Sequence, residues 1–284
     1  MRLGSAELTI VSDGTIRMDG GAMFGVVPRV IWSRLRPPDR RNRVELGLNC
    51  VLLRHGGKNV LIDTGVGTKH NASTRAIYHF RAGHLVGNLA RLGLAPEDID
   101  LVVLTHLHFD HVGGCTRFDS GNRLVPVFPR ATHLVQRDDW REATLTNERT
   151  RHAYLPDDFL PLEAAQQLEL LEGDTELLPG LWARRTGGHT AGHQIAYLES
   201  QGEQAVCLGD IVPLPQHLPL HYMTAYDIHP LETLDAKRHW LGQAERERWL
   251  VIFGHAISPR AGRLTRWEGR LSLVPEEIDT VEVS

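Results

Sequence analysis

Three histidines and an aspartate, His106, His108, Asp110 and His111, lie within six consecutive positions of this chain. The apolar residues 101–104 come directly before them and have the composition of a buried strand. Because side chains alternate along an extended segment, His106 and His108 project to the same side, as two ligands of one cation must. Imidazole and carboxylate groups together suit zinc, or iron and manganese with less selectivity. The segment therefore predicts a metal site at the end of a buried strand.

The pattern His106-x-His108-x-Asp110-His111 resembles the HxHxDH signature of the metallo-β-lactamase superfamily. Three later segments match the pattern of that superfamily in the same order, at residues 188–193, 208–210 and 253–255. The resemblance implies an α+β fold in which two mixed β-sheets lie face to face with helices outside them, the four-layer αββα sandwich. The absence of a clear linker favours one domain over residues 1–284.

The resemblance also implies seven metal ligands for two divalent ions per chain. One ion would be held by His106, His108 and His189, the second by Asp110, His111 and His255, and Asp210 would bridge both. Zinc is the expected metal, with iron, manganese or cobalt as alternatives.

Neighbouring polar residues are predicted to support this site rather than to bind metal. The comparison with the superfamily places Asp63 behind the metals, where it would steady a ligand histidine. His193 is predicted to be structural, because a second histidine four residues after His189 would over-supply the site. Asp227 is predicted to support its loop, and Cys115, which follows two glycines, to be a packed small residue.

A pair of such ions suits hydrolysis. Neutral imidazoles leave net positive charge on the metals, which stabilises a bridging hydroxide and lowers the pKa of water toward about 7. We expect this hydroxide to attack a lactone or ester carbonyl, and Asp110 to take or return a proton. The chain is therefore expected to be a metal-dependent hydrolase.

Two flanking segments narrow the substrate. Residues 19–28 and 223–233 resemble the quorum-quenching lactonase branch of the superfamily, which includes YtnP-like proteins, and so favour a small-molecule lactone or ester. Some acyl-homoserine lactonases have a tyrosine three residues after the bridging aspartate, where this chain has Pro213. Tyr222 or Tyr226 could supply the missing hydroxyl, and Tyr226 is predicted as a catalytic donor.

Four side chains are predicted to give the pocket an apolar wall with one or two hydroxyl donors. They are Met23, Phe24, Tyr222 and Tyr226, although Met23 and Phe24 could instead form a hydrophobic plug into the core. Three other functions remain open: a phosphotriesterase-like organophosphate hydrolase, a glyoxalase II-like thioesterase and a non-catalytic metal-binding module. A structural zinc site is usually closed and four-coordinate, so seven ligands favour two open metals and an enzyme.

Composition sets further bounds. A formal net charge of -4 gives no overall attraction to nucleic acid. Three cysteines with no CxxC pair, and a beginning without a signal-peptide pattern, favour a cytoplasmic protein. No apolar run approaches the length of a membrane span. The segment of about residues 19–45 is predicted to be an exposed loop or arm near the active site, and its arginines at 34–43 could be solvated, serve as the arm of a homodimer or form a rim that attracts anions.

The remaining pattern predicts elements on both sides of the cluster. A strand over residues 6–11 should end at a turn at Asp13-Gly14, and a hairpin should turn through residues 55–58. Helices are predicted over residues 83–92, 137–143 and 231–249, and a second sheet over 182–186, 194–198 and 204–208. Residues 144–180 predict only a loop and a helix over the active-site face.

Overall fold

Adjacent residues of the central strand β3 (Arg43–His55) point into different apolar cores on its two faces. The structure, a computed structural model that describes residues 1–283, places Val51 and Leu53 in a core with residues of the second sheet. Cys50 and Leu52 point the opposite way, into a core that contains helix residues such as Leu89. Side chains alternate along a strand, so a strand that is apolar at every position must be covered on both faces.

The first sheet has nine strands, in the order β1-β2-β3-β4-β6-β9-β10, with β5 and β18 also paired to β2. It is mixed, because β2, β3 and β4 are antiparallel whereas β4, β6, β9 and β10 run parallel. Its strands are β1 (Arg2–Leu3), β2 (Ala6–Asp19), β3 (Arg43–His55), β4 (Lys58–Ile62), β5 (Arg81–Ala82), β6 (Leu101–Val103), β9 (Thr132–Gln136), β10 (Leu168–Leu171) and β18 (Thr280–Val281).

The second sheet has seven strands in sequence order, β11 to β17, and only β14 and β15 pair in parallel. Its strands are β11 (Thr175–Leu178), β12 (Leu181–Arg185), β13 (Gln194–Ser200), β14 (Glu203–Cys207), β15 (Leu250–Ile252), β16 (Ala261–Trp267) and β17 (Arg270–Pro275). A separate two-stranded sheet is formed by β7 (Thr116–Phe118) and β8 (Leu124–Pro126).

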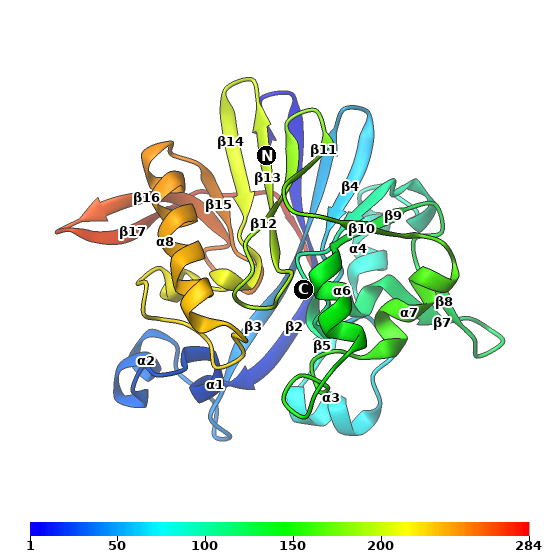
Figure 1. The fold of residues 1–284 in the computed structure, drawn as a ribbon, viewed down its shortest axis with the longest axis horizontal. Helices are drawn as coiled ribbons and strands as arrows, with labels where there is room; N and C mark the ends of the chain where they lie inside the picture. The colour runs from blue at the N-terminus through cyan, green and yellow to red at the C-terminus, as the bar shows by residue number, and fades with distance from the viewer. Residues whose placement is uncertain (284) are drawn as a thin grey trace.

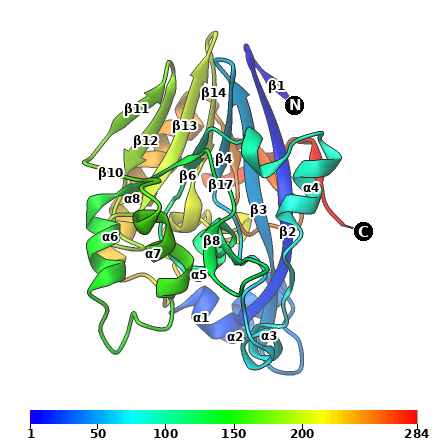
Figure 2. The ribbon, with the colours of Figure 1, turned by 90° about the vertical axis from the view of Figure 1, so that its right-hand side faces the viewer.

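Helices cover the outer face of each sheet (Figures 1 and 2). Residues of α4, α6 and α7 pack in the core on the outer face of the first sheet, and α8 packs against residues of β13, β14 and β15 of the second. Helices α1 and α2 lie at the ends of β2 and β3 and share the core of α8 (Figure 1). The helices are α1 (Gly20–Phe24), α2 (Arg29–Leu35), α3 (Ala72–Tyr78), α4 (Leu85–Arg91), α5 (Phe109–Val112), α6 (Arg137–Thr144), α7 (Pro156–Ala164) and α8 (Pro230–Arg246), with 3₁₀ turns η1 (Pro96–Asp98), η2 (Gly113–Cys115), η3 (Gly209–Ile211) and η4 (Pro215–His217). The order of layers is helix, sheet, sheet, helix, which confirms the predicted αββα sandwich.

The prediction of a turn at Asp13-Gly14 is wrong. Strand β2 continues through these residues to Asp19, with a register shift between Ser12 and Gly14. The Asp13 carboxylate is buried and accepts N–H groups of Val66, Gly67, Gly83 and Leu85. A bulge therefore turns this carboxylate toward two later loops without ending the strand.

The N-terminal segment of about 19–45 is not a loop throughout. Residues 20–24 form α1, because the Asp19 carboxylate caps the backbone N–H of Ala22 at 2.9 Å and Phe24 is fully buried. Phe24 stacks on Trp32 of α2, with ring centroids 5.3 Å apart. Burial of two aromatic rings offsets the low helix propensity of the glycines.

The predicted helices over 83–92 and 137–143 and the predicted strands over 182–186, 194–198 and 204–208 agree with the structure within two residues, whereas α3, β7, β8, β16 and β17 were not predicted. Residues 144–180 also differ from the prediction. There the structure has α7 and also two strands, β10 and β11, whose leucine- and glutamate-rich sequences contain Thr175 as their one β-branched residue and so resemble typical strands poorly. Helix α8 ends at Arg246, and Leu231, which was predicted to lie on its apolar side, is exposed. Within residues 1–283, no helix is long and apolar enough to cross a membrane.

Candidate metal centre

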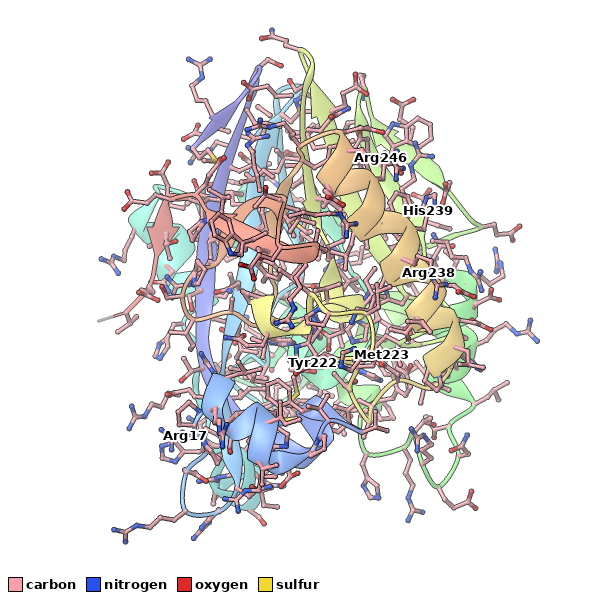
Figure 3. All side chains as sticks on the ribbon, turned by 90° about the vertical axis from the view of Figure 1, so that its left-hand side faces the viewer. Arg17, Tyr222, Met223, Arg238, His239 and Arg246 are labelled. Atoms are coloured by element: carbon pink, nitrogen blue, oxygen red, sulfur yellow. The ribbon has the colours of Figure 1, made fainter. Side chains whose placement is uncertain are left out.

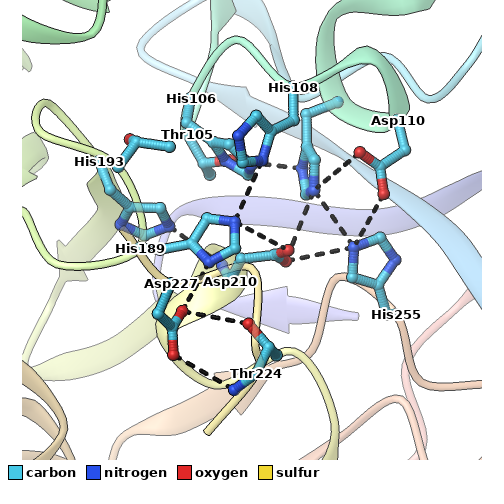
Figure 4. Close-up of polar contacts among 12 residues, drawn as sticks. Thr105, His106, His108, Asp110, His189, His193, Asp210, Thr224, Asp227 and His255 are labelled. Carbon is cyan, nitrogen blue, oxygen red and sulfur yellow. Dashed lines mark hydrogen bonds and ion pairs between the residues drawn. The ribbon is translucent and has the colours of Figure 1, made fainter. Parts of the chain in front are cut away.

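The predicted ligands follow the ends of strands in both sheets. His106 and His108 come after β6, Asp210 after β14 and His255 after β15. His189 lies in the connection between β12 and β13. Strands β14 and β15 are parallel, so their carboxyl ends lie at the same edge of the sheet and bring Asp210 and His255 together. All seven predicted ligands meet there (Figure 4).

The first group consists of His106, His108 and His189. Nε2 of His106 lies 3.0 Å from Nδ1 of His108, and Nε2 of His189 lies 3.1 Å from the same atom. Three nitrogens that converge in this way can hold one cation, because ligands about 2.0–2.1 Å from a tetrahedral zinc lie roughly 3.3 Å apart.

The second group consists of Asp110, His111 and His255. Nε2 of His255 lies 3.2 Å from Nε2 of His111 and 3.7 Å from Oδ2 of Asp110. The α5 turn makes this possible, because it turns Asp110 and His111 back toward the cluster directly after His108.

Asp210 lies between the two groups. Its Oδ2 is 3.5 Å from Nε2 of His189, and its Oδ1 is 3.2 Å from Nε2 of His255 and 3.5 Å from Nε2 of His111. Oδ1 is buried, yet none of its contacts with the described residues has hydrogen-bond geometry. A buried carboxylate oxygen without a donor is costly unless a cation compensates it.

The outer nitrogens of the ligand imidazoles are held by other groups. Asp63 Oδ2 lies 2.9 Å from Nδ1 of His111, and the Gly47 carbonyl accepts from Nδ1 of His255 at 2.8 Å. Asp227 Oδ1 lies 2.8 Å from Nδ1 of His189. When the outer nitrogen donates a proton, the inner nitrogen keeps its lone pair for a metal. Hydrogen bonding thus prepares these three rings as ligands.

Thr105 connects the two groups. Its hydroxyl donates to Asp63 Oδ2 at 2.9 Å and lies 3.1 Å from Nδ1 of His106. The Thr105 N–H also donates to Asp63 Oδ1, at 2.8 Å. Asp63 therefore supports ligands of both groups at once.

Residues with predicted supporting roles lie close to the cluster. Nε2 of His193 accepts the backbone N–H of Asp210 at 3.0 Å, and its Nδ1 lies 2.7 Å from the Thr186 hydroxyl. Both ring nitrogens thus have protein partners. Cys115 is fully buried, with its Sγ 3.4 Å from the Thr64 hydroxyl.

The ligand imidazoles differ in their pKa shifts. Burial, together with the neighbouring His111, lowers the pKa of His106 well below its usual value, so this ring is neutral. Burial also disfavours charged His111, but Asp210, Asp63 and Asp110 outweigh it and raise its pKa well above its usual value. The carboxylates that attract a proton there would attract a metal ion equally. The described donor set of imidazoles, carboxylates and the orphaned Asp210 oxygen therefore fits two divalent cations.

A cavity of about 130 Å³ opens onto the cluster. Ligands His108, Asp110, His189, Asp210 and His255 line it, together with the apolar or aromatic side chains Met18, Met23, Leu46, Tyr78, Phe109 and Tyr226 and the loop residues Arg149, His152 and Ala153. Burial, with Tyr78 and Asp110 nearby, raises the pKa of the Tyr226 phenol, which keeps its proton for donation.

Two predicted wall residues lie elsewhere. Phe24 is buried between Trp32 and His217 and does not line the cavity. Tyr222 lines a separate groove beside Arg238 and Leu241, and it lies on the face that carries α8 (Figure 3). The arginines at 34–43 do not line the cavity either. The tyrosines that line the cavity are Tyr226, which was predicted to do so, and Tyr78, which no motif in the sequence singled out.

Comparisons with known proteins agree with this geometry. The profile of the metallo-beta-lactamase superfamily matches residues 43–255. An N-acyl homoserine lactonase of Bacillus sp. is 28% identical over 177 residues, which are 58% of this chain and 63% of that protein, so the match spans less than two thirds of this relative. A Bacillus thuringiensis N-acyl homoserine lactonase is 24% identical over 73% of this chain and 80% of its own length. The crystal structure of a probable metal-dependent hydrolase from Staphylococcus aureus has a TM-score of 0.88 and 31% identity, over 98% of this chain and all of that one. The chain therefore belongs to the metallo-beta-lactamase superfamily and is a metal-dependent hydrolase.

Proposed function

We propose that this hydrolase is a dinuclear lactonase that opens small, neutral lactones. The observation that carries the proposal is the position of Asp210, whose two carboxylate oxygens face different histidine groups. One carboxylate shared in this way supports two metal ions held close together, with His106, His108 and His189 on one ion and Asp110, His111 and His255 on the other. Zinc suits these imidazole and carboxylate ligands.

Two bound divalent ions would polarise the substrate carbonyl and lower the pKa of a water molecule toward about 7. The chain supplies the remaining functions. Asp110 lines the cavity and carries the carboxylate that would take a proton from the attacking water and return it to the leaving alkoxide. Tyr226 lines the same cavity and would donate to the developing oxyanion.

The walls of the cavity support an uncharged substrate with a short substituent. Met18, Met23, Leu46 and Phe109 make part of the lining apolar. A cavity of about 130 Å³ is small beside the roughly 300–1,000 Å³ of typical ligand pockets. A lactone ring with a short tail suits this space better than a long acyl chain.

Relatives support the same substrate class. The proteins from Bacillus sp., Bacillus thuringiensis and Rhizobium radiobacter that match this chain are named N-acyl homoserine lactonases. At identities of 24–28%, these names support lactone hydrolysis as the reaction class but do not identify the particular lactone.

A substrate panel on metal-analysed protein tests the proposal. It compares γ-lactones with alkyl substituents of increasing length, an aryl ester, a phosphotriester, a thioester and a phosphomonoester. We expect the highest kcat/KM for short-tailed lactones and little phosphomonoesterase activity. The Asp210→Asn protein should lose every activity that belongs to this site, which excludes a contaminating hydrolase. Efficient thioester, phosphotriester or phosphomonoester turnover without lactone turnover would overturn the proposal.

A further inference from the structure

Arg149 is a cationic side chain in the wall of the active-site cavity. It lies in the connection between α6 and α7 and lines the cavity with His108, Asp110 and Tyr226. Its Nη2 donates to the Ala225 carbonyl at 2.9 Å and to the Asp227 carbonyl at 3.2 Å. The guanidinium is thus fixed beside the loop that carries Tyr226.

These two bonds leave part of the guanidinium free. Within residues 1–283, Arg149 has no carboxylate within ion-pair distance, and its Nε and Nη1 donate no hydrogen bond. Arg43 shows the contrast, because its guanidinium pairs with Asp39 at 2.9 Å. A guanidinium has five N–H donors and is always charged, so Arg149 offers unused, charged donors at the cavity.

The lining of the cavity combines polar and apolar side chains. His152 lies on the same loop as Arg149 and also lines the wall, whereas Met18, Met23 and Leu46 line it with apolar side chains. A substrate held only by its tail would leave the charged donors unused. A hydrogen-bond acceptor on the substrate would bind these free N–H donors of Arg149.

We propose that Arg149 forms a subsite for a hydrogen-bond acceptor that lies outside the reacting ring, such as the carbonyl of an acylamino substituent. This subsite makes Arg149 a specificity-determining residue, and the inference rests on the proposed lactonase function. Because two backbone carbonyls already hold the guanidinium, little conformational freedom is lost when the acceptor binds. A charge-assisted hydrogen bond of this kind typically changes affinity by about 10–100-fold.

Two matched γ-lactones test the subsite by turnover. One carries an acylamino group on the α-carbon, and the other carries an alkyl group of equal length at the same position. We expect Arg149→Gln to lower the ratio of kcat/KM for the first lactone to that for the second by about tenfold or more, mainly through KM. Arg149→Lys, which keeps a cation but not the fork of donors, should lose part of the ratio. Arg141→Gln is the control, because Arg141 is exposed like Arg149, lies on the preceding helix α6 and does not line the cavity.

Binding of the two corresponding lactams, which resist hydrolysis, separates this inference from the proposed function. Calorimetry on the metal-loaded wild-type protein should show tighter binding of the acylamino lactam, and Arg149→Gln should remove the difference. If the lactams are discriminated but neither lactone is opened, the lactonase proposal fails and the subsite stands. Equal losses for both lactones and both lactams in Arg149→Gln would show that Arg149 only holds its loop, and would overturn the subsite.

Discussion

Nδ1 of His189 lies 2.8 Å from Oδ1 of Asp227, and both side chains are buried. Asp227 also accepts the hydroxyl and the N–H of Thr224, at 3.2 Å each, so its carboxylate is fixed within its own loop before it meets the histidine. This arrangement sets the orientation of the His189 ring and keeps its inner nitrogen available as a ligand.

We therefore expect Asp227→Asn to weaken metal binding by about 10–100-fold, the usual effect of removing such a partner. Competition with a chelator, followed by metal analysis, measures the change. Asp235→Asn is the matched control, because Asp235 lies on the exposed side of α8. Unchanged metal affinity in Asp227→Asn would show that Asp227 only supports its loop.

The number of metal ions bound per chain should distinguish a variant of the bridging residue from a variant of a residue that binds only one ion. His255→Ala removes a ligand of the second group only, and we expect protein with close to one metal ion per chain. Asp210→Asn removes the negative charge that faces both groups, so it should weaken both ions. Elemental analysis after dialysis against a fixed free-metal concentration measures both variants. Full double occupancy in both would contradict the ligand assignment.

The sequence predicted this cluster well because its residues lie in short motifs at the ends of strands. The motif of residues 106–111 specifies its own local geometry, an extended pair of histidines followed by the α5 turn. His189, Asp210 and His255 could be selected only through the family resemblance, because nothing in their local sequence shows that they converge.

The cavity wall was harder to predict. Tyr78 comes from α3 and Arg149 from a loop in the poorly patterned residues 144–180, and neither has a motif around it. Phe24 and Tyr222 were selected because they flank the right segments, yet their side chains pack elsewhere. The direction of a loop side chain depends on tertiary packing. The hydrophobic periodicity of the sequence carries no information about that packing.

Two tyrosines are candidates for the proposed oxyanion donor. Tyr226 and Tyr78 both line the cavity, and burial raises the pKa of each phenol, so both remain protonated at neutral pH. We expect Tyr226→Phe to lower kcat for a lactone by about 10²–10³-fold, as the loss of one such donor typically does. Tyr78→Phe, which removes the corresponding hydroxyl from the other tyrosine of the lining, is the comparison. Steady-state kinetics on metal-matched proteins decides, and a large loss in Tyr78→Phe alone would transfer the role to Tyr78.

Lys237 of α8 gives a prediction about stability. Its side chain is fully buried, and its ammonium donates to the carbonyls of Pro219 and Tyr222, at 3.1 and 2.6 Å. Burial lowers the pKa of this amine from 10.5 to about 7. Between these two values the unfolded chain binds more protons than the folded chain, so the contribution of Lys237 to the free energy of unfolding rises with pH.

Lys237→Met should therefore remove a positive slope from the pH dependence of stability. The expected difference in slope between wild type and variant is at most about 1.4 kcal/mol per pH unit, reached well above pH 7. The window of pH 7–8.5 is best, because the buried thiols of Cys50, Cys115 and Cys207 have raised pKa values and their titration in the unfolded chain lowers stability at higher pH. Urea unfolding of both proteins at saturating metal measures the slopes, and effects of metal binding cancel in the difference. Parallel slopes would mean that Lys237 stays charged in the folded protein throughout this window, held by its two carbonyl partners.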